Sequence, residues 1–361
     1  QKTSEFGFGA MVKTTKWLHK DESAYRKFFL DTFEWTVPEG GLKWPHIEST
    51  RGHENFGAMV ALDGMRSHGI KVRAHTMFWD NVPDWVVPLS GNELKHEMEK
   101  HMKSCVAHTK GKVEHWDVYN ENIHYDSFQQ HLNDPNITSW MYTEVHKLDP
   151  NVKLFLNEWG VVNSQRYTTA YYDRIKILKD SGVPVYGIGI QSHLSGVDIR
   201  SVKERLDLLS RTGLPMWATE LRIADIDEHK KADKLEDILR FYFSYPAMEG
   251  IMLWGFTPHM SEPKGALVDG NMVVSSTAGR RYIKLVRHDW RTHETHNLPS
   301  SNSLSVRGFK GDYVLRLKHG KKVIHEKAFT LGSKGAKLQI QGSGMLRYSF
   351  VFGIHNCSES I

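Results

Sequence analysis

The stretch His115-Trp116-Asp117-Val118-Tyr119-Asn120-Glu121-Asn122 decides the fold of this chain. It begins as a short run that can be buried as a β-strand and ends in three consecutive polar residues, one of which is the carboxylate Glu121. In an α/β barrel, reactive side chains lie where the parallel strands end, at the C-terminal face of the sheet. A strand that changes from core-forming to polar residues at its end is typical of that fold. The stretch therefore predicts a barrel strand that delivers Glu121 to an active site.

Apolar runs bounded by polar turns alternate with helical patterns along most of the chain. The predicted strands are residues 6–12, 33–37, 71–79, 115–121, 154–159, 187–193, 215–223 and 250–257, and helical periodicity occurs in 92–109, 137–148, 168–180, 202–212 and 231–244. Such alternation indicates parallel strands covered by helices. No Gly-rich phosphate loop follows the first strand, which favours an eight-stranded (β/α)8 TIM barrel over an open dinucleotide-binding sheet. We interpret Gly7 and Gly9, inside the first strand, as positions of close packing at the barrel wall.

The 361 residues are enough for a barrel and a smaller second domain. We predict a catalytic barrel over residues 1–291 and a polar linker with a Ser/Asn cluster over 292–305. Within residues 306–361, the stretches 312–317 and 322–325 alternate apolar and polar positions and are separated by Gly-Lys turns, which predicts a small antiparallel β unit. Such a unit either caps the barrel or binds carbohydrate, and we favour the cap.

Composition excludes several classes of function. The chain has 47 Lys and Arg against 42 Asp and Glu, without a basic block interleaved with aromatics, so nucleic acid is not an expected partner. It has no apolar run of about 18 residues, so no membrane span is expected. The 11 Trp, 13 Tyr and 16 Phe supply flat apolar faces of the kind against which sugar rings lie. The two cysteines, Cys105 and Cys357, do not make a disulfide framework, and the sequence leaves open whether they pair.

The sequence favours secretion weakly. The N-terminus lacks a basic-then-apolar leader, which fits either a cytosolic protein or a secreted one whose leader has been removed. Asn136-Ile137-Thr138 and Asn356-Cys357-Ser358 are glycosylation acceptor patterns, and they favour the secreted alternative.

The predicted strand ends carry a carboxylate-rich set of polar and indole side chains. In chain order they are Glu39 and Lys43 after the second strand, His75 and Trp79 on the third, Asn120 and Glu121, then Asn157, Glu158 and Trp159, Gln191 and His193, Glu220 and Arg222, and Trp254. An apolar core does not explain them, because isolated carboxylates at buried strand positions are costly unless they are paired or functional.

Glu121 and Glu220 stand on strands four and seven, which lie nearly opposite in an eight-stranded barrel. Two carboxylates that flank a cavity are what glycoside hydrolysis requires, since one protonates the leaving oxygen and the other attacks or activates water. Asn120 is placed to bond a sugar hydroxyl, and His193 to orient Glu220. A metal site built from His75, His193 and the two glutamates is the alternative, but no His-x-His or His-Glu-x-x-His spacing supports it.

Six motifs in order resemble those of family-10 glycoside hydrolases, the endo-β-1,4-xylanases. They are Leu42-Lys43-Trp44, Arg73-Ala74-His75-Thr76-Met77-Phe78-Trp79, Trp116-Asp117-Val118-Tyr119-Asn120-Glu121, Gly187-Ile188-Gly189-Ile190-Gln191-Ser192-His193, Trp217-Ala218-Thr219-Glu220-Leu221 and Gly250-Ile251-Met252-Leu253-Trp254-Gly255-Phe256. The resemblance covers about residues 5–290. Phe78-Trp79-Asp80 and the 306–313 segment are more similar to the plant and animal branch than to the bacterial one.

The resemblance implies a retaining double displacement in which Glu121 is the general acid and base and Glu220 the nucleophile. It further implies that Asn120 holds the sugar 2-hydroxyl and that Gln191 and His193 surround the nucleophile. Lys43, His75 and Trp79 would bind the sugars on the non-reducing side, with Glu39 beside Lys43. Trp254 would pack over the sugar at the cleavage point. For retention we expect an ionised Glu220, a protonated Glu121 and about 5 to 5.5 Å between the carboxyl groups.

Three positions depart from the family pattern. Gly40 and Gly41 occupy the place of an Asn that usually binds the neighbouring sugar. Arg222 stands where Asp is common; on a strand it shares a face with Glu220, so we expect this cation to favour the ionised nucleophile. The loop 258–262 lacks the second Trp that many relatives place over the cleft.

We therefore predict a secreted, monomeric endo-β-1,4-xylanase that needs no cofactor or metal and acts on xylan or a related β-1,4-glycan. A β-1,4-glucanase, or a mixed xylanase and cellulase, is the alternative within the class, because Gly40 and Gly41 would widen a subsite. A catalytically weak carbohydrate-binding protein is the alternative outside it. The presence of both Glu121 and Glu220 argues against a pure binder.

Overall fold

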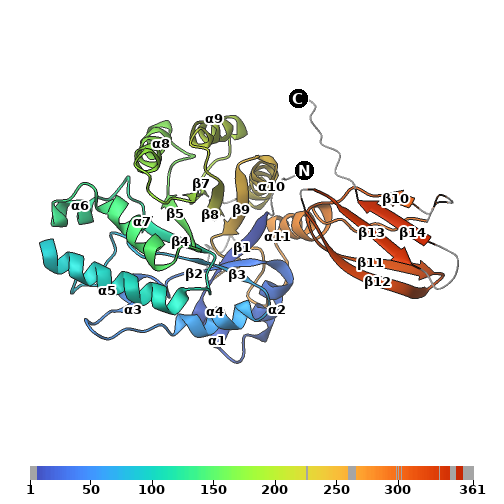
Figure 1. Cartoon of the computed structure of the whole chain (residues 1–361), viewed down its shortest axis with the longest axis horizontal. Helices are drawn as coiled ribbons and strands as arrows, with labels where there is room; N and C mark the ends of the chain where they lie inside the picture. The colour runs from blue at the N-terminus through green and yellow to red at the C-terminus, as the bar shows by residue number, and fades with distance from the viewer. Residues whose placement is uncertain are drawn as a thin grey trace. The chain divides into compact units, whose positions relative to one another are not determined.

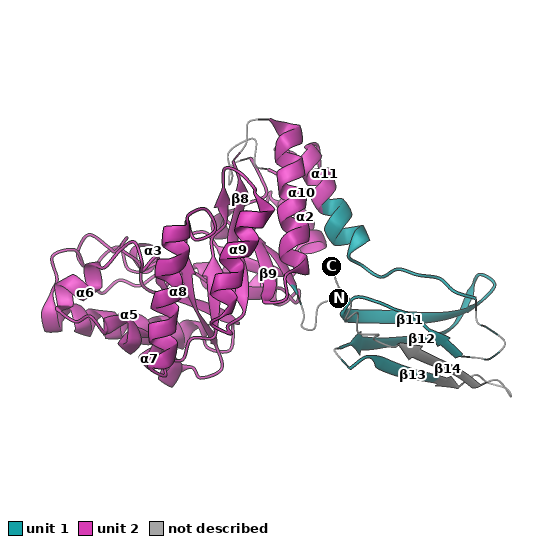
Figure 2. Cartoon of the chain, turned by 90° about the horizontal axis from the view of Figure 1, so that it is seen from above, with its two compact units in different colours: residues 1–6, 283–361 teal, residues 7–282 magenta. Residues whose placement is uncertain are grey.

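The structure is a computed structural model that describes residues 6–224, 227–258, 266–297, 299, 301, 303–332, 334–341 and 347–352. It contains two compact units, one of residues 7–282 and one of residues 1–6 with 283–361, coloured separately in Figure 2.

The larger unit is built on a closed ring of parallel strands. Within the described residues these are β1 (Gly7–Val12), β2 (Trp35–Pro38), β3 (Lys71–Ala74), β4 (His115–Asn120), β5 (Lys153–Glu158), β6 (Gly187–Ile190), β8 (Met216–Ile223) and β9 (Met248–Leu253). Each pairs in parallel with its neighbour, and the pairings of β1 with β9 and of β6 with β8 close the ring. A two-residue strand, β7 (His193–Leu194), adds to the outer part of β8. The predicted eight-stranded barrel is confirmed.

Helices follow the strands and lie outside the ring, as Figure 1 shows. Those described are α1 (Thr14–Leu18), α2 (Ser23–Thr32), α3 (Trp44–Ile47), α4 (Ala58–Arg66), α5 (Gly91–Thr109), α6 (Ser127–Leu132), α7 (Ile137–Leu148), α8 (Gln165–Asp180), α9 (Ile199–Ser210), α10 (Glu228–Ser244) and α11 (Thr277–Lys284). The π-helical turn η2 (Leu285–Asp289) belongs to the smaller unit. On α5, Leu94, Met98, Met102 and Cys105 recur at helical spacing and are all buried, so the amphipathic period explains how the helix covers the sheet.

Three predicted strands end several residues earlier in the structure than the apolar pattern indicated. The eighth, predicted to reach residue 257, ends at Leu253, so Trp254 lies just beyond β9. The third ends at Ala74, although the N–H groups of Met77 and Phe78 still donate to the carbonyls of Asp117 and Val118 on β4. The sixth is divided into β6 and β7 at Ser192, whose φ of 60° turns the chain out of the extended conformation. The breaks in the third and sixth occur at the C-terminal ends of strands, where the polar residues begin.

Gly7 and Gly9 are packed against the barrel wall, as predicted. A Cβ on Gly9 would lie 2.4 Å from Met252 Sδ and 2.6 Å from the carbonyl oxygen of Trp35, and one on Gly7 would lie 2.5 Å from the Trp217 ring. A side chain at Gly9 would therefore displace the backbone of β2, and one at Gly7 would displace the Trp217 and Trp35 indoles.

We expect Gly9→Ala to destabilise the barrel by about 1–3 kcal/mol, the usual cost of overpacking a core. The matched control is Gly196→Ala, because nothing lies within 4 Å of a Cβ at Gly196. Denaturant unfolding of the two variants and the wild type measures the difference. Equal unfolding free energies for Gly9→Ala and Gly196→Ala would contradict the packing argument.

The smaller unit is rich in β-strands. Those described are β10 (Ser303–Ser305), β11 (Gly311–His319), β12 (Lys322–Leu331), β13 (Ala336–Gln341) and β14 (Arg347–Phe352). β11 pairs with β12 and β13 with β14, both antiparallel, while β10 pairs in parallel with β14. Leu338 is buried at the centre of a small cluster with Leu304, Leu315, Leu317 and Phe329. Strand β10 lies in the stretch that the sequence pattern assigned to a linker.

Some sequence predictions concern residues that the structure does not describe. The loop residues 259–262, Cys357 and the Asn356 acceptor lie outside the described residues. Cys105 is buried in α5, and Asn136 is exposed just before α7. In the described part of the chain, no helix is both long and apolar enough to cross a membrane.

Candidate active site

Glu121 stands one residue beyond β4, at the C-terminal end of the barrel strands. Its φ is 61°, in the left-handed region that residues with a Cβ seldom adopt. The Glu121 N–H donates to the Asn157 carbonyl at 2.8 Å, and the Glu121 carbonyl accepts from the N–H groups of His124 and Tyr125, both at 3.1 Å. A tight turn over residues 121–125, which we call the Glu121 turn, therefore begins at the carboxylate itself.

Both oxygens of the buried Glu121 carboxyl accept a hydrogen bond. Trp79 Nε1 donates to Oε2 at 2.8 Å, and Gln191 Nε2 donates to Oε1 at 2.8 Å. These two donors, from the ends of β3 and β6, fix the direction in which the carboxyl group points.

Glu220 lies in β8, where the register with β9 is irregular between Ala218 and Leu221. His193 Nε2 lies 3.1 Å from Oε2 of Glu220, and Asn157 Nδ2 donates to Oε1 at 3.0 Å. Burial raises the pKa of Glu220, but the His193 hydrogen bond, the electrostatic influence of His75 and His193 and the Asn157 bond outweigh it, so the pKa lies below its ordinary value. The group is thus held ionised, as a nucleophile requires.

Asn157 and Gln191 each contact both glutamates. Asn157 accepts the Glu121 N–H at its carbonyl and donates to Glu220 from its side chain, with Thr219 Oγ1 holding Asn157 Oδ1 at 2.5 Å. Gln191 does the reverse, since its side chain donates to Glu121 and its carbonyl accepts the Glu220 N–H at 3.0 Å. The two carboxylates therefore belong to one rigid site. Asn157 was noted at a strand end but not proposed as a site residue.

The other predicted site residues lie around Glu121 and Glu220, except Glu39. Lys43 Nζ lies 4.8 Å from the centre of the Trp79 ring, and the Trp254 ring contacts those of His75 and His193 at 5.8 and 6.5 Å. Burial lowers the pKa of Lys43, against the opposing influence of Glu220, Glu39 and Glu121. Asn157 Nδ2 donates to Asn120 Oδ1 at 3.0 Å.

Glu39 lies beside Lys13 at a partly exposed position. Its carboxylate is 3.6 Å from Lys13 Nζ and its side chain is 43% exposed. Glu39 therefore acts on the site at most through its charge near Lys43.

A buried ionic network supports His75, and sequence reasoning did not identify it. Asp117 Oδ2 lies 2.9 Å from His75 Nδ1, and Arg73 forms a bidentate pair with the same carboxylate, with its Nε 3.2 Å from Oδ2. All three side chains are buried. Charged residues inside two adjacent barrel strands were the available signal, because buried charges must be paired.

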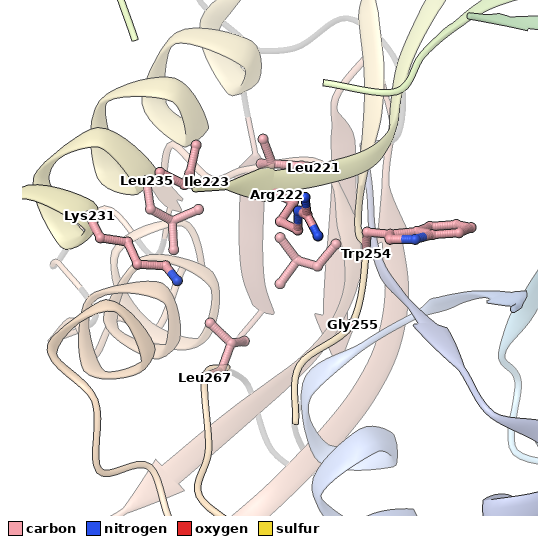
Figure 3. A pocket seen from close by; sticks show the side chains of 9 residues that line it. Leu221, Arg222, Ile223, Lys231, Leu235, Trp254, Gly255 and Leu267 are labelled. Carbon is pink, nitrogen blue, oxygen red and sulfur yellow. The ribbon is translucent and has the colours of Figure 1, made fainter. Parts of the chain in front are cut away.

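The departures from the family pattern have local explanations. The nearest atoms to a Cβ on Gly40 belong to the His46 ring, at 3.0 Å, and those near Gly41 to Ala58, so neither glycine borders an empty space. Arg222 lines a small pocket with Lys231 and Leu235, between β8, β9 and α10 (Figure 3). The largest influences that lower the Glu220 pKa come from His193, His75 and Asn157, and not from Arg222, to which the sequence prediction gave that effect.

We expect His193→Ala to move the acidic limb of the pH profile of kcat/KM to higher pH. The His193 hydrogen bond lowers the pKa of Glu220, so its loss raises that pKa, and a higher pH is needed to ionise the nucleophile. Initial rates from acid to neutral pH measure the limb. His68→Ala, at an exposed histidine after α4, is the control. An acidic limb at the same or lower pH in His193→Ala would contradict the assignment.

The two histidines of the considered metal site have other partners, because His75 bonds Asp117 and His193 bonds Glu220. In the portion of the chain that the structure describes, no group of three or more His, Cys, Asp or Glu side chains is arranged to hold a metal ion.

Comparison with known proteins adds to this geometry. A family model described as glycosyl hydrolase family 10 matches residues 1–275. The chain belongs to glycoside hydrolase family 10. Family membership, predicted from six motifs, is confirmed.

Similar proteins include both enzymes and a regulator. Endo-1,4-beta-xylanase 2 of Arabidopsis thaliana is 32% identical over 325 residues, which is 88% of this chain and 30% of that protein. The anti-sigma-I factor RsgI6 of Acetivibrio thermocellus is 35% identical over 315 residues, 85% of this chain and 40% of that protein. This family-10 chain thus spans less than half the length of these two relatives. The crystal structure of xylanase 10B from Thermotoga petrophila RKU-1 in complex with xylobiose has a TM-score of 0.72 and 26% identity, covering 79% of this chain and 95% of that one.

Proposed function

We propose that this chain is an endo-β-1,4-xylanase that acts by a retaining double displacement. The observation that carries the proposal is the coupled pair of carboxylates, in which Asn157 and Gln191 each hold both Glu121 and Glu220. An acid and a nucleophile fixed in one rigid site are what glycoside hydrolysis needs.

In the first step, a carboxylate oxygen of Glu220 attacks the anomeric carbon of the sugar as the glycosidic C–O bond breaks. Glu121 gives its proton to the departing oxygen, and a covalent glycosyl-enzyme forms. His193 and Asn157 keep Glu220 ionised before the attack.

In the second step, Glu121 is a carboxylate and removes a proton from water, whose oxygen attacks the anomeric carbon and releases Glu220. Formation of the glycosyl-enzyme removes the negative charge of Glu220, which makes Glu121 a stronger acid and suited to this change of role. The sugar leaves with its original anomeric configuration after two inversions.

Xylan is the favoured substrate because relatives at 32–33% identity are named endo-1,4-beta-xylanases. The glucanase alternative relied on extra room beside Gly40 and Gly41. The neighbouring His46 ring and Ala58 lie where that room would be, which does not favour it.

Release of reducing sugar from xylan and from carboxymethyl-cellulose tests the proposal. We expect release from xylan at a rate well above that from the cellulose derivative, and early product with retained configuration by proton NMR. Binding of xylan without release of sugar would favour the carbohydrate-binding alternative, and inverted product would exclude the double displacement.

We also propose that the protein acts as a secreted monomer. Secretion is supported by the acceptor triplet at Asn136, which is exposed at the start of α7. Mass of the protein from a secreting eukaryotic host, before and after removal of N-linked glycans, tests whether Asn136 is modified.

A further inference from the structure

The end of β5 carries a buried carboxylate that the mechanism above does not use. Glu158 is the last residue of β5 and its exposed fraction is 0%. It follows Asn157, but its contacts are with a different set of atoms from those of the catalytic pair. Burial of a charged group without partners is costly, so its hydrogen bonds indicate what it serves.

Three donors converge on Glu158, and two of them come from the Glu121 turn. The Ile123 N–H donates to Oε2 at 3.0 Å, and His124 Nδ1 lies 2.7 Å from Oε1. The Trp159 N–H also donates to Oε1, at 3.0 Å. Only a carboxylate accepts on both oxygens, so an amide at this position would place its NH₂ group against one of these donors.

The His124 ring is held from its other side as well. It stacks on the Trp159 ring with centroids 3.9 Å apart and planes at 15°, and the Tyr167 ring meets its edge at 4.5 Å. The turn that begins at Glu121 is thus attached to the end of β5 through a backbone N–H and through a packed imidazole.

The turn needs such attachment because Glu121 is in an unfavourable backbone conformation. A left-handed φ costs a residue with a Cβ roughly 1–2 kcal/mol, and such residues persist where their surroundings hold them. At Glu121 itself the restraint is the bond from its N–H to the Asn157 carbonyl. Glu158 restrains two later positions of the turn, Ile123 and His124, through their hydrogen bonds to its carboxylate.

We propose that Glu158 and His124 act as a clamp on the Glu121 turn, and that Glu158 is a positioning residue for proton transfer by Glu121. This inference rests on the proposed function. Burial raises the pKa of Glu158, while the bonds from His124 and from the Ile123 and Trp159 N–H groups oppose that rise. The donors therefore serve to keep a buried carboxylate in place beside the acid and base residue.

A purely structural role for Glu158 would weaken the fold without singling out one chemical step. A clamp on Glu121 has a specific consequence for kcat/KM, which reports the steps up to the glycosyl-enzyme: loss of the clamp lowers it only for substrates whose leaving oxygen needs a proton. The two roles are separated by comparing two xylobiosides, one with a 2,4-dinitrophenyl leaving group that departs without protonation and one with an unactivated phenyl group that requires it.

We expect Glu158→Ala to lower kcat/KM for the phenyl xylobioside by about 100-fold, the scale of loss that a displacement of about 1 Å causes. For the dinitrophenyl xylobioside the loss should stay below about 3-fold, because Glu220 and its partners are unchanged. Glu158→Gln should lower kcat/KM for the phenyl xylobioside less than Glu158→Ala does, again with little effect on the dinitrophenyl xylobioside, since the amide keeps some of the three bonds. His124→Ala leaves both backbone donors in place, so its loss of kcat/KM for the phenyl xylobioside should be smaller still.

Glu114→Ala is the matched control. Glu114 also accepts a backbone N–H, that of Val72, but stands just before β4, at the opposite end of that strand from Glu121. Glu114→Ala should leave kcat/KM for the two xylobiosides unchanged or lower both by the same factor. Wild-type activity on xylan is measured first, so that failure of the proposed function is seen separately.

Equal losses on the two xylobiosides in Glu158→Gln and His124→Ala, or no loss in either variant, would overturn the clamp. These two variants keep the test informative if Glu158→Ala does not fold, because each removes only part of the contact set.

Discussion

Glu220→Ala is expected to release no measurable reducing sugar from xylan, a loss of about 10⁴-fold or more in kcat. The physical reason is that the substitution removes the carboxylate that is held ionised by His193 Nε2 at 3.1 Å and Asn157 Nδ2 at 3.0 Å. Without the nucleophile, no glycosyl-enzyme forms. Reducing-sugar assays on xylan and trapping of the intermediate by mass spectrometry measure the effect.

The control for Glu220→Ala is Glu249→Ala. Glu249 lies near the start of β9, where it accepts from Tyr186 Oη at 3.2 Å, and it is remote from the strand ends that form the site. We expect normal turnover in this control and retained xylan binding in Glu220→Ala. Residual hydrolysis of xylan above about 1% of the wild-type rate in Glu220→Ala would show that another group is the nucleophile.

Glu121→Ala is expected to reduce kcat on xylan by about 10²–10⁴-fold, the usual contribution of general acid and base catalysis. The 2,4-dinitrophenyl xylobioside should still react rapidly with Glu220, because its leaving group needs no proton. The glycosyl-enzyme should then accumulate, since water lacks a base to activate it. Pre-steady-state release of dinitrophenolate measures this burst.

Added azide tests the same assignment in the other direction. Azide is an anion and needs no base, so it should restore turnover of Glu121→Ala and give a glycosyl azide of retained configuration. Thr143→Ala, on the half-buried surface of α7, serves as a control that azide should not accelerate. Absence of azide rescue, or an inverted product, would contradict the role of Glu121.

Much of the site could be predicted because barrel enzymes place their chemistry at one end of each strand. Glu121, Gln191, His193 and Glu220 were selected as polar residues at the ends of apolar runs, and the structure brings all four together. Strand position and residue type are properties of the sequence, and for parallel strands in a ring they also specify which side chains converge.

Other features of the site depend on contacts that the sequence pattern does not contain. Nothing in the order of residues says that Asn157 bonds Glu220 with its side chain and Glu121 with its carbonyl. The same holds for Trp79, predicted to bind sugar, whose indole donates to the Glu121 carboxyl. Glu39 also stands at a strand end, yet its carboxylate pairs with Lys13, a contact that the order of residues does not reveal.

The sequence by itself determined the barrel, the helices that cover it and the position of Glu121 and Glu220 at strand ends, because apolar periodicity and strand ends depend on the local order of residues. Only the tertiary structure decided the backbone conformation of Glu121 and the contacts that hold it. The left-handed φ of Glu121 and the buried contacts of Glu158 arise only when β4, β5 and β6 are held side by side. Such a conformation is unfavourable for an isolated turn, so it is fixed by neighbours that are distant in sequence.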